Sequence, residues 1–338
     1  MRTLLPVMVL SALLFNGLFA SHANAEPILN ADGNVAQQIR LKAEQGDAAA
    51  QNDLGIMYAN GKGVAQDDKQ AAFWFSKAAE QGYAKAQLIL GLMYSEGQGG
   101  VAKEYKLAVS LFRKAAEQGL AMAQYNLGVM YASGVGIRHD DKQAVAWYRK
   151  AAEQGETIAQ NNLGAMYANG VGVAQDDKQA AFWYRKAAEQ GLPTAQNNLG
   201  AMYVSGVGVP QDDNQAVAWY RKAAEQGDAE AQNNLGVMYA TGKGVAQDDK
   251  QAALWFRKAA AQGLPMAQFN LGQMYFNGTG VPQDYAQAYL WTNLAAAQKL
   301  EQAVKARDSL IKVLTPLQIE EGQRLVREWR VAHPQAVE

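Results

Sequence analysis

Few residues of this 338-residue chain could do chemistry, and they are not grouped in the sequence. The chain contains no cysteine, which excludes disulfide bonds, a thiol nucleophile and thiolate metal ligands. Beyond the N-terminal segment its histidines are His139 and His333, which lie far apart and lack the partners that a metal site or a catalytic triad requires. We therefore expect no catalytic residue, no metal site and no cofactor.

Two recurring motifs have the residue types of functional sites. Gly-x-Gly loops such as Gly206-Val207-Gly208 resemble phosphate-binding loops, but no strand precedes them, and the third glycine and the lysine of a P-loop are missing. Paired carboxylates such as Asp176-Asp177 stand where a helix should begin, where aspartate satisfies free N–H groups and complements the helix dipole. Both motifs are interpreted as structural.

These motifs recur because the chain is a tandem repeat. A Leu-Gly dipeptide returns every 36 residues, with one step of 37, as Leu54-Gly55, Leu90-Gly91, Leu127-Gly128, Leu163-Gly164, Leu199-Gly200, Leu235-Gly236 and Leu271-Gly272. A fixed period of this length indicates a solenoid, a propeller or an array. The length would allow two globular domains, but the unbroken period favours a single elongated one.

Each repeat reads as a helical hairpin. In the unit 155–190, Ala159, Leu163, Met166 and Tyr167 share one face of a first helix, called here the A helix. Residues 180–187 repeat the helical spacing with a partly aromatic face, and they form the second, or B, helix. Asp176 and Gln179 have the spacing of a capping box at its start. One hairpin cannot bury these faces alone, so neighbouring hairpins must cover them.

The recurring alanine, Leu-Gly, Met-Tyr, Gly-x-Gly and closing Trp-Tyr-x-Lys-Ala-Ala pattern resembles the Sel-one-like repeat family, relatives of the tetratricopeptide repeats. The resemblance covers most of the chain, and seven copies keep the register. It implies an all-α, right-handed α-solenoid that works as an adaptor or scaffold, and bacterial members are often exported. It does not imply one activity.

The ends of the chain are predicted to differ from the repeats. Arg2, the apolar run 4–20 and the triplet Ala23-Asn24-Ala25 have the pattern of a signal peptide cleaved after Ala25. We therefore expect an exported, most simply periplasmic, protein without a membrane span after cleavage. The predicted parts are a signal peptide at 1–25, an N-terminal segment and capping half-repeat at 26–45, seven repeats at 46–81, 82–118, 119–154, 155–190, 191–226, 227–262 and 263–298, capping helices at 299–332 and a tail at 333–338.

The second repeat departs from the others. It has one extra residue in its Gly-rich loop, Leu111 in place of the recurring tryptophan, and Glu104 in place of the capping aspartate. Leu88 and Ile89 stand where most repeats have asparagine, so we expect extra apolar surface there. Simple divergence and a contact site are both compatible with these changes.

A partner site is predicted on the A helices, which line the concave face if the hairpins stack as tetratricopeptide repeats do. We call the residues at one equivalent position of all seven A helices a column. The predicted site is a column that lies outside the Ala-Leu-Met-Tyr core set, with flanking columns one turn earlier and one turn later. Its asparagines would clamp a peptide backbone, and Tyr125 and Phe269 would be anchors; the alternative is an asparagine ladder satisfied by water or by neighbouring repeats. The column consists of Asn52, Leu88, Tyr125, Asn161, Asn197, Asn233 and Phe269.

The function predicted from these observations is a non-enzymatic scaffold that binds another protein or an extended peptide in this groove. Lys plus Arg number 31 and Asp plus Glu number 32, so the chain is nearly neutral and has no attraction for nucleic acid. One alternative is a cell-envelope enzyme of the β-lactam hydrolase type, but the relatives linked to that activity carry a cysteine pair in each repeat. Another is a scaffold associated with polysaccharide or peptidoglycan, which only the aromatic residues support.

Overall fold

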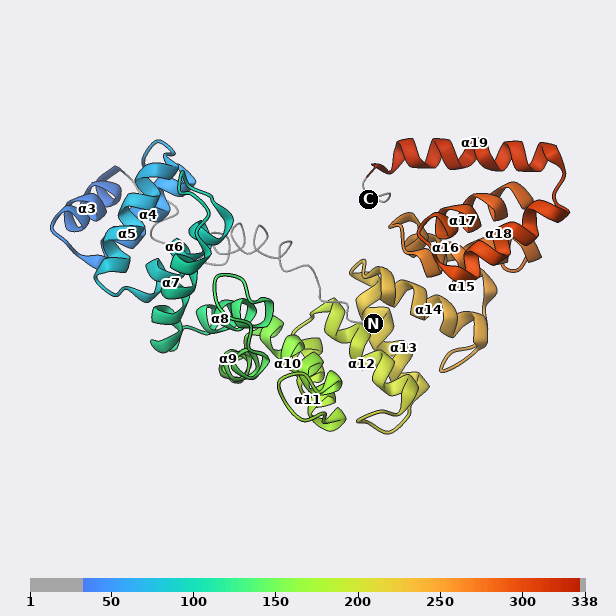
Figure 1. Cartoon of the computed structure of the whole chain (residues 1–338), viewed down its shortest axis with the longest axis horizontal. Helices are drawn as coiled ribbons and strands as arrows, with labels where there is room; N and C mark the ends of the chain where they lie inside the picture. The colour runs from blue at the N-terminus through green and yellow to red at the C-terminus, as the bar shows by residue number, and fades with distance from the viewer. Residues whose placement is uncertain (1–32, 335–338) are drawn as a thin grey trace. The chain divides into compact units, whose positions relative to one another are not determined.

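The structure is a computed structural model that describes residues 33–334, and its regular elements are the α-helices α3 to α19 (Figure 1). The predicted signal peptide and most of the predicted tail lie outside these residues. None of the described helices is both long and apolar enough to span a membrane.

The repeats are helical hairpins, as the sequence predicts. The A helices are α4 (Ala48–Asn60), α6 (Ala84–Glu96), α8 (Ala121–Ser133), α10 (Thr157–Asn169), α12 (Pro193–Ser205), α14 (Ala229–Thr241) and α16 (Pro265–Asn277). The B helices are α5 (Asp68–Glu80), α7 (Tyr105–Glu117), α9 (Asp141–Glu153), α11 (Asp177–Glu189), α13 (Asp213–Glu225), α15 (Asp249–Ala261) and α17 (Tyr285–Ala297).

The Gly-x-Gly loops are the turns between A and B helices. The first glycine ends the A helix in a left-handed conformation, as Gly206 does with φ 68°. The second glycine passes the preceding repeat so closely that a Cβ atom on Gly208 would lie 2.1 Å from the carbonyl oxygen of Asp177. Only glycine fits this approach, so the motif is structural.

Most B helices begin with the predicted aspartate cap. The Asp176 carboxylate accepts hydrogen bonds from the N–H groups of Lys178 and Gln179, and Asp212 accepts one from Gln215. Glu104 makes no such bond at the start of α7, which confirms the expected loss of the cap in the second repeat.

Within a hairpin the two helices approach through the glycine of the Leu-Gly dipeptide. A Cβ atom on Gly236 of α14 would lie 2.7 Å from the ring of Phe256 of α15, and the pairs Gly128–Tyr148 and Gly200–Tyr220 repeat this distance. The preceding leucine is fully buried in each of these repeats. This contact explains the glycine of the dipeptide in these repeats, and in the last repeat Gly272 approaches Thr292 in place of an aromatic ring.

Buried glutamines join successive repeats, a feature that the sequence analysis missed. At the fourth position of α14, Gln232 donates a hydrogen bond of 3.1 Å to the carbonyl of Ala224 in α13. Its own carbonyl oxygen accepts one of 2.9 Å from Gln262, which follows α15. The A-helix glutamine therefore ties the preceding B helix to its own hairpin. The bond to the preceding B helix is also made by Gln51, Gln87, Gln124, Gln160, Gln196 and Gln268.

Five B helices, α7, α9, α11, α13 and α15, carry an Arg-Lys pair near their ends, and the pair of α13 has specific partners. Arg221 donates to the hydroxyl of Tyr239 in the next A helix at 2.9 Å, and the Lys222 ammonium lies 4.1 Å from the ring centroid of Trp219. Positive charges at this end of a helix also complement the helix dipole. The structure adds an inter-repeat hydrogen bond and a cation–π contact.

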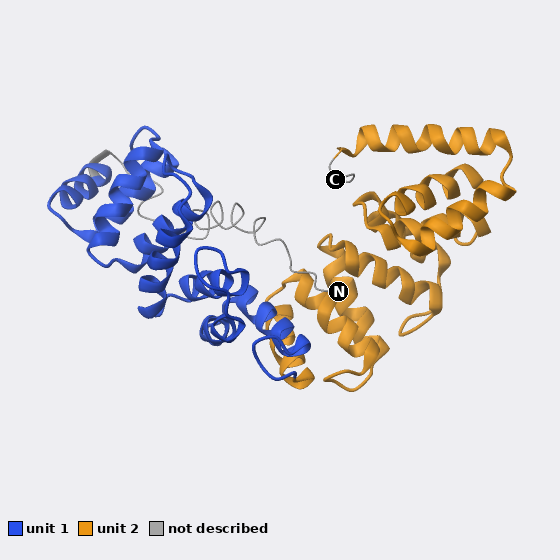
Figure 2. Cartoon of the chain, viewed as in Figure 1, with its two compact units in different colours: residues 1–175 blue, residues 176–338 orange. Residues whose placement is uncertain are grey.

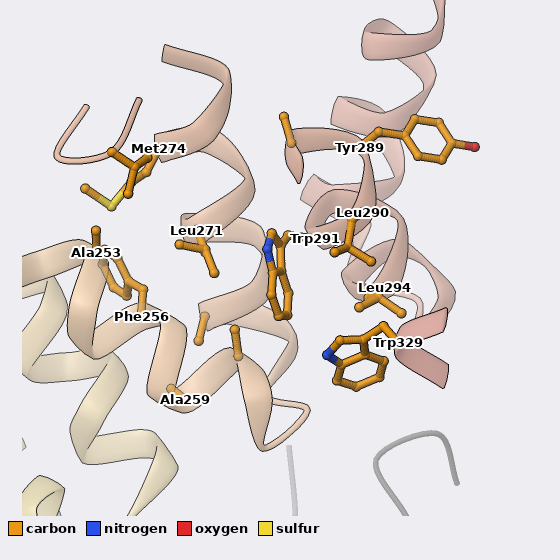
Figure 3. Close-up of a cluster of buried hydrophobic side chains, with 14 of the residues drawn as sticks. Ala253, Phe256, Ala259, Leu271, Met274, Tyr289, Leu290, Trp291, Leu294 and Trp329 are labelled. Atoms are coloured by element: carbon orange, nitrogen blue, oxygen red, sulfur yellow. The ribbon is translucent and has the colours of Figure 1, made fainter. Parts of the chain in front are cut away.

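Helices cap both ends, as predicted. The half-repeat α3 (Gly33–Glu44) packs on α4, and α18 (Glu301–Val313) and α19 (Pro316–Ala332) follow the last hairpin. Thr315 and Gln318 form a capping box at the start of α19. Figure 3 shows Trp291, Leu294 and Trp329 gathered in the cluster between α17 and α19, with the two indole rings 6.2 Å apart. His333 was assigned to the tail, but its ring stacks on Trp329 and so belongs to the end of α19.

Contacts divide the chain into two compact units, which Figure 2 shows in different colours. Unit 1 ends at Gln175, and unit 2 begins at Asp176. The prediction of one elongated domain differs from this division, which falls in the loop of the fourth hairpin. Each hairpin packs on its neighbours, so the described residues form several small cores instead of one.

The second repeat does not present the extra apolar surface that was expected. Leu88 and Ile89 are buried, Leu88 together with residues of α7 and α8 and Ile89 with residues of α5. The extra loop residue moves the turn away from the preceding repeat, since a Cβ on Gly99 would lie 3.6 Å from the Asp68 carbonyl oxygen. The substitutions thus repack the interior of unit 1.

We predict that Gly236→Ala lowers the free energy of unfolding by about 1 to 3 kcal/mol, the usual cost of overpacking a core. The added methyl group would collide with the buried Phe256 ring. Denaturant unfolding followed by circular dichroism measures the change. The control is Val237→Ala at the next, exposed position, with an expected change within about 0.5 kcal/mol. Equal effects of the two substitutions would contradict the close-approach argument.

Candidate functional site

The seven residues of the predicted partner site lie at the fifth position of the A helices, and the structure corrects the assumption that this column lies outside the core. Asn197 is half-buried. The other six, Asn52, Leu88, Tyr125, Asn161, Asn233 and Phe269, are buried. A binding role for these residues stays a prediction, but they are also part of the packing between repeats.

In unit 2 the asparagines form a ladder between repeats. Asn234, at the sixth position of α14, donates a hydrogen bond of 2.9 Å to the Asn197 side chain one repeat earlier. Asn270 of α16 donates one of 3.0 Å to Asn233 in the same way. Neighbouring repeats therefore satisfy these amides, which was the alternative to a peptide clamp.

The ladder is interrupted in the first two repeats. Asn52 is only 2% exposed, and its Oδ1 atom has no hydrogen-bond partner among the described residues. The sixth position one repeat later, which supplies the donor in unit 2, is occupied by Ile89. A buried amide oxygen without a donor costs stability, so the isoleucine leaves a defect in the ladder.

The two predicted aromatic anchors differ in surroundings. Phe269 packs with Ala295, Ala296 and Ala303 under the C-terminal cap, so it belongs to a core cluster. The ring of Tyr125 lies 6.0 Å from that of Tyr148 in the same hairpin. Burial, with a smaller contribution from the charge of Glu156, raises the pKa of Tyr125 to about 12, so its hydroxyl stays protonated at neutral pH.

In unit 2, solvent reaches the A helices at the flanking columns, the second and ninth positions. Thr194 at the second position is half-buried, and the exposed residues are Glu230 and Met266 at the second position and Ala201, Val237 and Gln273 at the ninth. Val237 is 38% exposed and Met266 is 37% exposed. A partner that lies along the A helices of this unit meets these side chains first.

Three carboxyl groups at the starts of A helices, of which Glu156 and Asp228 are half-buried and Glu230 is exposed, have raised pKa values. Burial raises the pKa of Glu156 before α10, and it raises the pKa of Asp228 and of Glu230 at the start of α14. The Asp228 charge raises the pKa of Glu230 further. A raised pKa means that the folded protein disfavours the ionised carboxylate. Each group therefore lowers the free energy of unfolding when the pH is above its pKa, and this cost disappears as the pH falls and the group is protonated.

No arrangement for catalysis emerges in the described residues. No group of three or more histidine and acidic side chains in residues 33–334 is placed to hold a metal ion. The His139 ring lies 3.1 Å from the Asp141 carboxylate, at an open depression of about 630 Å³ that Arg138, Lys142 and Gly172 also line. Asp140 there caps α9, so the acids of this loop already have structural partners.

The asparagine ladder predicts that an Asn→Leu substitution has opposite effects on the free energy of unfolding at Asn52 and at Asn233. Asn52→Leu should raise the free energy of unfolding by about 1 kcal/mol, because it removes an unpaired buried oxygen and copies Leu88 of the next repeat. Asn233→Leu should lower it by a similar amount, because Asn270 loses its acceptor. Chemical denaturation of both variants tests this, and a loss of stability in Asn52→Leu would show that its amide has a role the ladder does not explain.

Comparison with known proteins identifies the repeats. The Sel1 repeat model matches residues 48–83, 84–120, 121–156, 157–192, 193–228, 229–264 and 265–300. Each matched copy begins two residues after the corresponding boundary predicted from the sequence. No curated protein matches the chain.

Several solved structures are similar to this chain. A Sel1 repeat protein from Oxalobacter formigenes is 38% identical over 90% of both chains, with a TM-score of 0.65. The protein c5321, a protective antigen of uropathogenic Escherichia coli with an SLR fold, is 32% identical, with 97% of this chain and 85% of that chain covered and a TM-score of 0.47. Immunity protein Pa5087 from Pseudomonas aeruginosa is 22% identical, with coverage of 63% and 81% and a TM-score of 0.39. The seven matched copies and the hairpins that they form show that this chain belongs to the Sel1 repeat family.

Proposed function

We propose that the protein is a non-enzymatic scaffold that binds another protein, as an extended segment, along the exposed positions of its A helices. The observation that carries this proposal is the variation of solvent-reached A-helix positions around a nearly constant core. The B helices repeat charged residues in most copies, with an Arg-Lys pair in five of them, although their sixth position also varies, as in Phe182 and Leu254. The second position of the A helices changes in almost every copy: Ala49, Lys85, Met122, Ile158, Thr194, Glu230 and Met266.

Packing does not explain this variation, because the core positions of the same helices are nearly constant. In unit 2, the second- and ninth-position side chains are exposed or half-buried, while alanine, leucine and methionine of the same helices are buried. Exposed apolar groups such as Val237 and Met266, among polar neighbours, are suited to contact a partner chain. The buried asparagine ladder holds this face in place behind them.

The experiment compares two pairs of substitutions in unit 2 with matched exposure. Val237→Ser with Met266→Ser changes the A helices, and Phe182→Ser with Leu254→Ser changes two B-helix side chains that are 44% and 40% exposed. Both variants should keep their helical circular dichroism, since exposed substitutions usually alter stability by within about 0.5 kcal/mol. Only the A-helix variant should lose the partner recovered by crosslinking with the unchanged protein. Loss in the B-helix variant alone would place the binding surface on the other helix.

We also propose that the protein is exported to the periplasm and that its partner is met there. The support is the sequence of the first 25 residues, with Arg2, an apolar segment and Ala23-Asn24-Ala25. N-terminal sequencing of protein from the exported fraction should give Glu26 as the first residue. A chain that still begins at Met1 and remains with the membrane fraction would contradict both the cleavage site and the compartment.

A further inference from the structure

Pairs of arginine and tyrosine join neighbouring repeats of unit 2 at regular intervals. Arg221 of α13 donates a hydrogen bond of 2.9 Å to the hydroxyl of Tyr239 in α14. The same bond, at 3.1 Å, joins α11 to α12 and α15 to α16. We call this row the arginine ladder and each pair a rung; the rungs are Arg185–Tyr203, Arg221–Tyr239 and Arg257–Tyr275.

Each guanidinium group of the ladder has hydrogen-bonding capacity left over. An arginine side chain has five N–H donors, and the tyrosine hydroxyl takes one of them. Arg221 and Arg257 are exposed, and Arg185 is half-buried. None of the ion pairs within residues 33–334 includes any of the three. The ladder therefore presents positive groups to solvent with most of their donors free.

The tyrosine hydroxyl holds the guanidinium group away from the acid of its own helix. In α3, Arg40 forms an ion pair of 2.9 Å with Glu44, four residues later. Glu225 stands at the same spacing from Arg221, but the described residues show no ion pair between them, and Arg221 bonds to Tyr239 instead. The hydroxyl thus fixes the direction of the guanidinium group across the boundary between repeats.

The acids next to the ladder leave its positive charge largely in place. The N–H group of Asp248 bonds to the carbonyl of Tyr239, but the Asp248 carboxylate caps α15, and the caps of α13 and α17 are placed in the same way. Arg257 has Ala261 where other B helices have a glutamate, and Lys258 adds a second positive charge. The last rung is therefore the most positive.

The ladder lies on the opposite side of the A helices from the surface proposed above. Tyr239 follows Glu230, at the second position of α14, by about two and a half helical turns. Successive A helices touch through the hydrogen bond from Asn234 to Asn197, so their axes, and hence successive rungs, are about 10 Å apart. An extended chain advances about 3.3 to 3.6 Å per residue. Three residues of such a chain therefore span one repeat.

A fixed guanidinium group with free donors is suited to bind a carboxylate through two parallel hydrogen bonds. We propose that the arginine ladder of unit 2 binds an acidic protein segment in extended conformation, with one carboxylate on each rung. The spacing fits aspartate or glutamate at every third residue. This second binding surface goes beyond the proposed function, because it uses none of the exposed A-helix positions.

The distribution of charge favours an acidic protein segment over nucleic acid. The whole chain has a net charge of −1, so its positive groups do not form the broad basic face that nucleic acid requires. The ladder is a single row of separate cations. It suits a chain that carries isolated carboxylates at a matching interval.

The test uses the full chain and three dye-labelled peptides, with binding measured by fluorescence anisotropy at low ionic strength. The first peptide is acetyl-Glu-Gly-Gly-Glu-Gly-Gly-Glu-amide, the second has glutamine in place of glutamate, and the third has its three glutamates in one block between glycines. The unchanged protein should bind the first about tenfold more tightly than the second, since exposed ion pairs each add a small gain. It should also bind the first more tightly than the third.

Substitutions assign the preference for glutamate to the ladder. Arg221→Gln with Arg257→Gln should abolish it. Tyr239→Phe with Tyr275→Phe keeps both charges but releases the guanidinium groups, and it should lose part of the preference. Circular dichroism checks that each variant keeps its helices.

The matched control is Arg327→Gln with Arg330→Gln, at exposed positions of α19, which removes the same charge and should keep the preference. Equal affinity of the unchanged protein for the glutamate and glutamine peptides would overturn the site, and so would an equal loss in the two arginine variants. Tighter binding of trigalacturonate than of the first peptide would overturn the assignment to a protein segment. Val237→Ser with Met266→Ser leaves the ladder intact and should keep peptide binding, so the two surfaces are judged separately.

Discussion

Each hairpin of this protein buries its apolar face against neighbouring hairpins, and the fold depends on that contact. The buried A-helix glutamines show how it is held: Gln232 donates to the carbonyl of Ala224 in the preceding B helix and accepts from Gln262 after its own. A buried amide that meets both partners adds specificity, because a shifted register would leave donor and acceptor unpaired in an apolar interior. The free-energy cost of such a mismatch keeps each repeat in the same register against its neighbour.

The same contact divides the A helices into two kinds of surface. Fifth-position side chains such as Asn233 are covered by the next repeat, whereas Val237 and Met266 remain exposed on the same helices. The buried positions must suit the neighbouring hairpin, and the exposed ones are released from that requirement. This separation explains how the copies keep one architecture while their second and ninth positions differ. In the proposed scaffold function, exposed residues set the partner chemistry without altering the fold.

The sequence determines the hairpin more clearly than it determines the relation between hairpins. The Leu-Gly period, the Asp176 cap and the Thr315–Gln318 capping box are local patterns, and the structure has each of them. The burial of Asn52 and Asn233 depends on the rotation of one hairpin against the next, which the helical period of a single unit does not contain. A usable signal was present, however. Glutamine at the fourth position of all seven A helices and asparagine at the sixth position of five are uniform polar residues within apolar helices, and such uniformity among copies indicates a bonded interior group.

Polar groups of the A helices can then be separated by whether neighbouring repeats satisfy them and whether solvent reaches them. Gln232 and Asn233 are buried and bonded, so their chemistry is used within the fold. Asn52 is buried and unpaired because Ile89 has replaced its donor, and its 2% exposure leaves no path for a ligand. Glu156 is half-buried, so solvent reaches it, and burial raises the pKa of its carboxyl group. Val237 and Met266 differ from all of these groups, because they are exposed and no neighbouring repeat covers them. Their identity is therefore the least constrained by the fold.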